Sequence, residues 1–257
     1  MTRLPLARMA EIADEGARTG TAIAQFTNDH ELDVPDAYAV QALSISRRVA
    51  RGERVVGVKM GLTSRAKMAQ VGVDEVIWGR LTDGMLLADG APLSLGGYVH
   101  PRVEPEIAFL IERPLGGRVT AMQAMDAVGA VAAAAEVIDS RYEDFKFALP
   151  DVIADNSSSS GIVVGAWCDP STPIDNLGIA LSVDGRNQEV GSSAAILGDP
   201  VRSLVEAARM VAEAGLQLEP GWIVLAGGAT AAVPLVAGSS YRVTVESLGR
   251  VGFTVTE

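Results

Sequence analysis

The chain has 257 residues, of which 48% are hydrophobic and 21% are charged, and its formal net charge is −11. This length can bury one large core, but the sequence lacks the clustered Lys and Arg residues that bind nucleic acids or anionic membranes. Apolar runs such as 127–138 are broken by charge well short of 18 residues, the N-terminus has no signal-peptide core, and the single cysteine cannot form an internal disulfide. We therefore expect a cytoplasmic globular protein with neither nucleic-acid nor membrane partners.

The first fifty residues predict two helices, over 6–20 and 35–52. Asp33 is placed to cap the second helix, and Pro35 suits its first turn. The remainder of the chain is rich in glycine and in strand-like segments. We therefore divide the chain into an N-terminal helical segment, residues 1–52, and a mixed-β domain, residues 53–257, that carries the candidate catalytic residues.

Hydrophobic patterning in the second part predicts strands interrupted by a few helices. Thr120 and Gln123 have the spacing of a capping box, so a helix is expected to start there and run through 120–134. Asp184 and Gly185 form a hairpin turn signal. The expected strands are 55–62, 103–112, 135–140, 177–186, 222–232, 241–249 and 250–257, and the other expected helices are 63–72 and 199–215, the last ended by Gly215.

Glu104 and Glu106 raise a question about charge, because they lie two residues apart in a segment that otherwise resembles a buried strand. Alternate residues of a strand share a face, so the two carboxylates should lie side by side and repel each other. Glu136 interrupts a second apolar run. Three carboxylates on neighbouring strands offer the hard oxygen ligands that Mg²⁺ or Mn²⁺ prefers. The alternative is a solvated pair, with Glu136 bound to an arginine.

Lys59 is one of only three lysines in the chain, and it lies within an apolar, strand-like run. Burying an ammonium group without a partner is costly, so an anionic partner is expected beside it. The alternative is that the aliphatic stem crosses the sheet and the ammonium group reaches water.

Other catalytic classes receive little support. His30 and His100 are the only histidines, no G-x-S-x-G motif occurs, and neither phosphate-binding glycine motif is present. The loop 155–161 and the glycine-rich turns 191–198 and 226–232 could hold a carboxylate through backbone N–H groups and hydroxyls. Each of them could equally be a simple turn.

A series of ordered motifs gives a more specific indication. From about residue 35 to the C-terminus, the chain resembles the 2-hydroxypentadienoate hydratase and 4-oxalocrotonate decarboxylase branch of the fumarylacetoacetate hydrolase superfamily. The motifs that carry the resemblance are GVKMGLTSRAKMAQVGV, IWGRLTDGML, HPRVEPEIAF, AEVIDSRYEDF, LPDVIADNSSSSG, GSSAAILGDP and VLAGGATAA.

The resemblance implies an α+β fold with a mixed, rolled β-sheet core and a divalent metal, Mg²⁺ or Mn²⁺, held by carboxylates. Carried over by motif, the implied site comprises metal ligands Glu104, Glu106 and Glu136, the catalytic residue Lys59, and substrate-binding residues Leu62, Ser160 and Thr230. It also implies a small 2-oxo dicarboxylate substrate, a homo-oligomer and a complex with the pathway hydratase.

The choice between the two branches depends on one position. Hydratases of this group read E-P-D-[FY]-G where this chain has EVIWG, so Ile77 replaces an acid that would assist the addition of water. We therefore expect decarboxylation of 2-oxohex-3-enedioate to 2-hydroxypenta-2,4-dienoate in the meta-cleavage degradation of aromatics. The alternatives are a 2-hydroxypenta-2,4-dienoate hydratase and a non-catalytic partner subunit of that hydratase.

Overall fold

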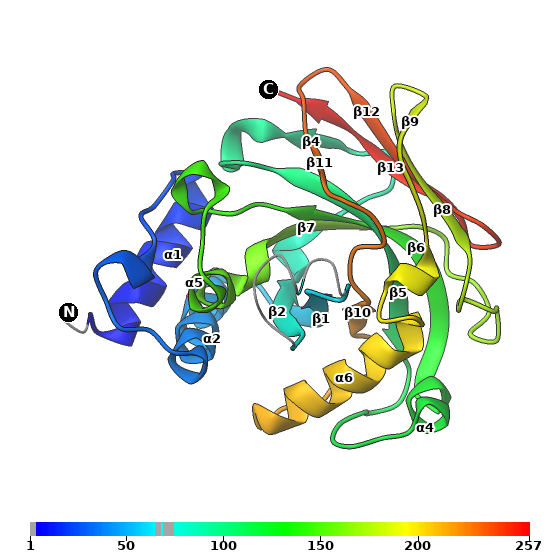
Figure 1. Cartoon of the computed structure of the whole chain (residues 1–257), viewed down its shortest axis with the longest axis horizontal. Helices are drawn as coiled ribbons and strands as arrows, with labels where there is room; N and C mark the ends of the chain where they lie inside the picture. Colours follow the sequence, from blue (N-terminus) through cyan, green and yellow to red (C-terminus); the bar gives the residue numbers. More distant parts are fainter. Residues whose placement is uncertain (1–3, 65–67, 69–74) are drawn as a thin grey trace.

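Two helices form the N-terminal part of the protein, as predicted. The structure is a computed structural model that describes residues 4–64, 68 and 75–257. Helix α1 (Leu6–Thr19) packs against α2 (Val34–Ala50), at the blue end of the chain in Figure 1. The Asp33 carboxylate accepts a hydrogen bond from the Asp36 N–H at 2.8 Å, and Pro35 lies in the first turn, so the predicted helix start is confirmed.

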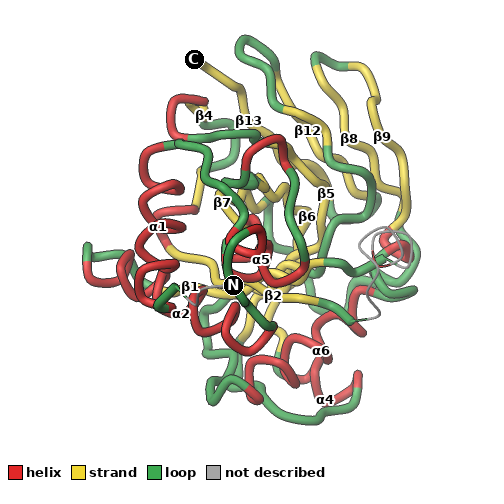
Figure 2. Tube along the Cα trace, turned by 60° about the vertical axis from the view of Figure 1, so that its left-hand side comes forward, coloured by secondary structure: helices red, strands yellow, loops and turns green. Residues whose placement is uncertain are grey.

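Within the described residues, eight strands form a mixed sheet in the order β2-β1-β10-β5-β6-β7-β3, with β11 paired to β5. Figures 1 and 2 show that this sheet curls round on itself, which confirms the rolled core. The strands are β1 (Val55–Gly61), β2 (Ile77–Thr82), β3 (Leu86–Leu87), β5 (Arg102–Ile111), β6 (Val128–Ile138), β7 (Ser159–Val164), β10 (Ile223–Leu225) and β11 (Val233–Pro234).

A second sheet packs on the outer face of the first, in the order β4-β13-β12-β8-β9. Its strands are β4 (Pro92–Ser94), β8 (Gly178–Val183), β9 (Arg186–Ser192), β12 (Ser240–Val245) and β13 (Gly249–Thr256). The predicted hairpin between β8 and β9 is confirmed, because Asp184 and Gly185 have φ values of 49° and 78°.

The remaining helices lie around the sheets. The α-helices are α4 (Ala121–Asp126), α5 (Leu149–Ala154) and α6 (Pro200–Glu213), and the short 3₁₀ helices are η1 (Phe26–Asn28), η2 (Asp83–Met85), η3 (Leu95–Gly97), η4 (Glu143–Phe145), η5 (Asn156–Ser158) and η6 (Ser193–Ala195). Gly215 follows α6 with φ +75°, as the predicted helix end requires. In the stretches that the structure describes, no helix combines the length and the apolar character needed to cross a membrane.

One predicted helix is wrong in its extent. The capping box of Thr120 and Gln123 is present, but α4 ends at Asp126, and residues 128–138 form strand β6. Alanine favours helices, yet β6 lies between β5 and β7 and is buried on both faces. Packing in the sheet therefore outweighs the helix propensity of this segment. The predicted helix over 63–72 falls mostly outside the described residues.

The interior of the curled sheet is filled at one end. Small or branched apolar side chains from several strands meet there, namely Leu81, Ala108, Ala132, Ala134, Ile162 and Leu225. This end is therefore a packed core rather than a channel, and the polar side chains of the sheet interior lie toward the other end.

The N-terminal helices contribute to a separate apolar cluster. Met9 of α1 and Val40 of α2 pack together with Ile77 of β2, Tyr142 and Ile153 of α5. The helical segment thus covers the part of the curled sheet where β2 begins. The division of the chain at residue 52 stays a prediction.

Side chains, rather than another strand, satisfy the outer edge of β2. Asn156 accepts a hydrogen bond from the Arg80 N–H at 2.8 Å and donates one to the Arg80 carbonyl at 2.8 Å. Ser157 and the buried Gln41 both donate to the Trp78 carbonyl. The edge of β2 is thereby joined to the segment that precedes β7, which closes the curl of the sheet.

Asn156→Ala should therefore lower the free energy of unfolding. The substitution leaves two partly buried backbone groups of Arg80 without their Asn156 partner, at about 1–3 kcal/mol each. It also places alanine at φ 51°, where asparagine is better tolerated. Urea unfolding should show a loss of at least about 2 kcal/mol, whereas Asn187→Ala on the exposed β9 should change little. Equal stability of the two variants would contradict this account of how the sheet closes.

Candidate metal centre and active site

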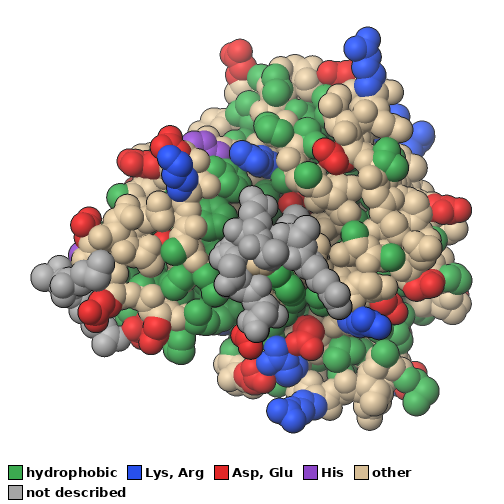
Figure 3. Space-filling model, viewed as in Figure 1, with side chains coloured by type: hydrophobic (Ala, Val, Ile, Leu, Met, Phe, Trp, Pro, Cys, Tyr) green, Lys and Arg blue, Asp and Glu red, His purple; other side chains and the backbone are tan. Residues whose placement is uncertain are grey.

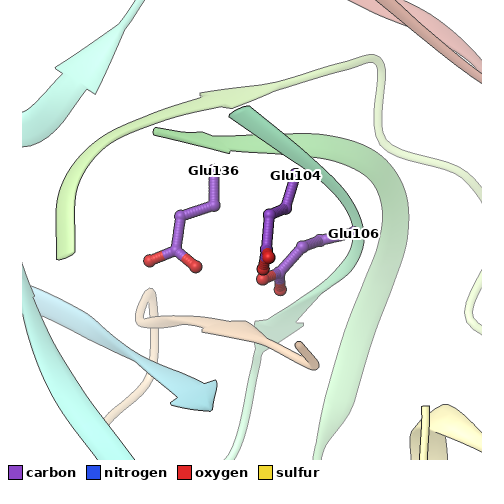
Figure 4. Close-up of side chains that lie close together, drawn as sticks. All are labelled: Glu104, Glu106 and Glu136. Atoms are coloured by element: carbon purple, nitrogen blue, oxygen red, sulfur yellow. The ribbon is translucent and has the colours of Figure 1, made fainter. Parts of the chain in front are cut away.

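Three glutamates meet inside the curled sheet. Strands β5 and β6 are antiparallel, with Glu104 directly opposite Glu136, and Glu106 lies two residues further on the same face of β5. One carboxylate oxygen from each residue lies within 4.8 Å of the others. Figure 4 shows the three side chains converging from the two strands. All three are buried, so the predicted solvated pair is excluded and the predicted side-by-side arrangement is confirmed.

Among the described residues, the charges of Glu106 and Glu136 are only partly compensated. Burial, together with the negative charge of Glu136, raises the pKa of Glu106 well above its usual value. Burial also raises the pKa of Glu136, although the charge of Lys59 opposes this effect. Glu106 Oε1 and Glu136 Oε1 are buried and accept no hydrogen bond from the described residues. Convergent, unpaired carboxylate oxygens fit a hard divalent cation such as Mg²⁺ or Mn²⁺.

Gly227 holds the Glu106 carboxylate in place. Its N–H donates a hydrogen bond to Glu106 Oε2 at 2.7 Å. Gly227 has φ +113°, and a Cβ atom there would lie 2.0 Å from Oγ1 of Thr63, so glycine is required. From its sequence, the turn 226–232 could either hold a carboxylate or be a simple turn, and in the structure its Gly227 N–H binds a carboxylate of the protein itself.

Lys59 lies beside the glutamates, and its predicted anionic partner is confirmed. Its Nζ atom lies 3.1 Å from Glu136 Oε2 and donates a hydrogen bond to the Ser157 carbonyl at 3.1 Å. The side chain is 5% exposed, so the alternative in which the ammonium group reaches water is wrong. Burial acts to lower the pKa of Lys59, but the carboxylates, Glu136 first, outweigh it and the pKa is raised. The site therefore holds a protonated ammonium group at neutral pH.

A strained turn presents the carbonyl that Lys59 contacts. Asn156, Ser157 and Ser158 have φ values of 51°, 52° and 60°, three consecutive residues in the left-handed region. Such a conformation costs energy and persists only where its surroundings impose it. The Asn and Ser residues were a signal for a turn, because Asn tolerates left-handed backbone and Ser hydroxyls hydrogen-bond nearby backbone groups. Its role in orienting Lys59 could not be seen from the sequence.

A buried arginine, Arg141, forms hydrogen bonds to the residues next to this turn. The Arg141 guanidinium forms an ion pair with Asp155 at 2.5 Å and donates hydrogen bonds to the carbonyls of Asp139 and Asp155, each at 2.6 Å. Burial raises the pKa of Asp155 to about 6, against the opposing charge of Arg141. Arg141 also donates to Ser160 Oγ. Arg141 and Asp155 were not predicted from the sequence, because their contact joins positions fourteen residues apart.

The three predicted substrate-binding residues lie at different places around the site. Leu62 follows β1 with φ 55° and packs beside the apolar cluster of the N-terminal helices. Ser160 is the second residue of β7 and shares the face of Ile162, which pairs with Glu136. Thr230 donates a hydrogen bond to the Ala231 carbonyl at 3.0 Å. Their roles in substrate binding stay predictions.

Ile77 faces the same side of the sheet as Lys59. It pairs with Gly61 across β1 and β2, and a Cβ atom on Gly61 would lie 3.0 Å from Ile77 Cγ1 and 3.8 Å from Lys59 Nζ. Trp78 points to the opposite face, where it stacks on Tyr38. Ile77 therefore does not pack beneath Trp78, and it forms an apolar wall beside the ammonium group.

Comparison with known proteins places this arrangement in a family. The family model for the fumarylacetoacetate (FAA) hydrolase C-terminal domain matches residues 63–256. The chain belongs to the fumarylacetoacetate hydrolase family. It is 54% identical to a protein named 4-oxalocrotonate decarboxylase from Pseudomonas sp., over 98% of this chain and 99% of that one. The family and the rolled fold expected from the sequence motifs are thus confirmed.

Two further members of the fumarylacetoacetate hydrolase family are informative. The solved structure of 4-oxalocrotonate decarboxylase from Pseudomonas putida G7, complexed with magnesium and adipate, superposes with a TM-score of 0.95 at 36% identity, covering 99% of this chain and 100% of that one. A 2-hydroxyhexa-2,4-dienoate hydratase from Comamonas testosteroni is 32% identical over 95% of this chain and 94% of its own length. Both branches of the family are therefore similar to this chain, the decarboxylase at higher identity.

Proposed function

We propose that this protein decarboxylates 2-oxohex-3-enedioate to 2-hydroxypenta-2,4-dienoate and CO₂, with Mg²⁺ or Mn²⁺ as cofactor. The observation that carries the proposal is the buried cluster of three glutamates with the Lys59 ammonium group 3.1 Å from one of them. The 54% identity to a 4-oxalocrotonate decarboxylase supports the choice of reaction. Magnesium in the Pseudomonas putida G7 structure supports the choice of cofactor.

The residues present fit a divalent cation. Glu104, Glu106 and Glu136 would hold it, since one oxygen of each converges. Glu106 Oε1 and Glu136 Oε1 are also buried without a hydrogen-bond donor among the described residues. A cation bound there supplies Lewis acidity toward the 2-oxo acid end of the substrate. The Gly227 N–H keeps Glu106 in position for this role.

Lys59 would stabilise the charge that develops in the reaction. When the distal carboxylate leaves as CO₂, the bonding electrons move through the conjugated chain to the 2-oxo oxygen. An ammonium group fixed by the Ser157 carbonyl and by Glu136 is already oriented, so it stabilises this negative charge without reorganisation. We therefore propose Lys59 as the catalytic residue of the chain.

The apolar wall formed by Ile77 favours loss of CO₂ over addition of water. Ile77 is 5% exposed and carries no group that could deprotonate or orient water. Exclusion of water also strengthens the electrostatic effect of Lys59. The wall thus supports the proposal of decarboxylation rather than hydration.

The decisive experiment is to supply purified protein and Mg²⁺ with each candidate substrate. CO₂ release from 2-oxohex-3-enedioate supports the decarboxylase. Loss of the dienol absorbance of 2-hydroxypenta-2,4-dienoate, without CO₂ release from the dicarboxylate, would establish the hydratase instead. Neither activity at saturating Mg²⁺ would favour a non-catalytic subunit, although packing alone gives no reason to bury four charged side chains together.

Ile77→Asp tests the role of the wall. We expect the variant to gain measurable hydration of 2-hydroxypenta-2,4-dienoate and to lose part of its decarboxylase rate, because the new carboxylate can orient water and repels the departing carboxylate. Its melting temperature should fall, since the position is surrounded by apolar side chains. Ile77→Asn is the uncharged control. A folded Ile77→Asp protein with unchanged decarboxylation and no hydration would show that this position does not choose the reaction.

We further propose that the protein forms a homo-oligomer and associates with the hydratase that consumes its product, as the family resemblance implies. Light scattering of the purified protein measures the first. Co-elution with the purified hydratase, compared with each protein alone, measures the second.

A further inference from the structure

Arg102 lies on the same face of β5 as the glutamates, one step nearer the open end of the curled sheet. It precedes Glu104 by two residues and pairs with Ile138, which in turn follows Glu136 by two residues on β6. The opposite end of the interior is filled by apolar side chains. Arg102 is half-buried, so a cation borders the open side of the carboxylate cluster.

The guanidinium of Arg102 is held in place but not neutralised. Its central carbon lies 4.3 Å from the centre of the Phe145 ring, a cation–π contact. No carboxylate among the described residues forms an ion pair with it. The nearby Asp139 carboxylate instead accepts hydrogen bonds from the backbone N–H groups of Val99 and His100. The charge of Arg102 is therefore free to bind an anion.

The aromatic group under Arg102 connects it to the apolar wall of the site. Phe145 and Phe147 have ring centres 5.8 Å apart, and Phe147 packs beside the cluster that contains Ile77. His100 meets the Phe145 ring edge-on at 6.1 Å, and its Nε2 atom is buried with no partner among the described residues. Figure 3 shows Lys and Arg side chains near a His side chain in the upper part of the face shown. A cation and an unpaired imidazole nitrogen thus adjoin a continuous apolar surface.

The distance between Arg102 and the three glutamates suits a ligand with two carboxylates. Two residues of a strand cover about 6.6 Å, and a six-carbon chain with bonds of about 1.5 Å spans a comparable distance between its two carboxylates. With one end of a 2-oxo dicarboxylate at the glutamates, the other end reaches the region of Arg102.

We infer that Arg102, seated on Phe145 beside His100, binds the substrate carboxylate that lies farther from the three glutamates, and so selects dicarboxylates over monocarboxylates. This inference rests on the proposed function. The product has lost that carboxylate, so it no longer has this contact and leaves more readily. A half-buried arginine attracts and orients the dicarboxylate.

Arg102→Met tests the inference, because methionine keeps an unbranched side chain against Phe145 and removes the charge. The measurement is calorimetric binding, with Mg²⁺ present, of 2-oxohexanedioate and of 2-oxohexanoate, two non-substrate ligands that differ in the distal carboxylate. We expect the Kd of the dicarboxylate to rise about tenfold or more, while the Kd of the monocarboxylate stays within twofold. Arg102→Lys should recover part of the affinity, and Arg186→Met, on the exposed β9, should match the wild type.

Equal changes for both ligands, or no change for either, would overturn the inference. Because binding is measured without turnover, its outcome is separate from that of the proposed function. If the wild-type protein releases CO₂ but Arg102→Met binds the two ligands with unchanged selectivity, only the proposed role of Arg102 is refuted. If the wild-type protein releases no CO₂ but Arg102→Met loses selectivity for the dicarboxylate, the proposed reaction is refuted and the proposed role of Arg102 stands.

Discussion

Glu106→Gln should abolish metal-dependent turnover while the protein stays folded. Glutamine keeps an oxygen that can accept the hydrogen bond from the Gly227 N–H, but it removes one anionic ligand. Because burial and Glu136 already raise the pKa of Glu106, its ionised form is costly without a cation. We therefore expect the metal-free variant to melt at the same temperature as the metal-free wild type, or higher.

The measurement combines turnover with thermal melts at increasing Mg²⁺. Wild-type protein should gain stability as Mg²⁺ is added, because a ligand that binds only the folded state stabilises it. Glu106→Gln should lose this gain, whereas Glu112→Gln, exposed just beyond the end of the same strand, should keep it. Wild-type turnover of Glu106→Gln at micromolar Mg²⁺ would remove Glu106 from the ligand set.

Lys59→Met should lower kcat by about 100-fold or more, the loss typical of one preorganised electrostatic group. Methionine fills the same buried space without the charge. The carboxylate cluster remains, so we expect the Mg²⁺-dependent rise in melting temperature to persist. The substitution therefore separates charge stabilisation in the reaction from binding of the metal.

Steady-state kinetics decide what Lys59 does. A fall in kcat with little change in KM supports stabilisation of the developing charge, and a change confined to KM would make Lys59 an anchor for a substrate carboxylate instead. Lys146→Met is the matched control, since Lys146 is 72% exposed and pairs only with the equally exposed Asp144 in the described part of the chain.

Local sequence predicted those parts of the protein that depend on neighbouring residues. The period of two in a strand placed Glu104 and Glu106 on one face, and the apolar flanks of Lys59 indicated burial with an anion. Caps and turns were equally readable, as Asp33 and the Asp184–Gly185 hairpin show, because their hydrogen bonds close within a few residues. Family motifs added the rolled fold, whereas Glu136 was indicated both by the apolar run that it interrupts and by these motifs.

Tertiary structure alone decided the features that join distant segments. The alanine-rich run 128–135 became a strand because β5 and β7 cover its edges, although its composition favours a helix. The left-handed turn at Ser157 is imposed by contacts with Arg141 and with β2, and the fixed place of Glu106 depends on Gly227, 121 residues away. Such long-range contacts leave no periodic pattern in the local sequence, so they could not be predicted from it. The sequence by itself therefore determined which side chains could perform the chemistry, and the long-range packing determined which backbone groups hold them in place.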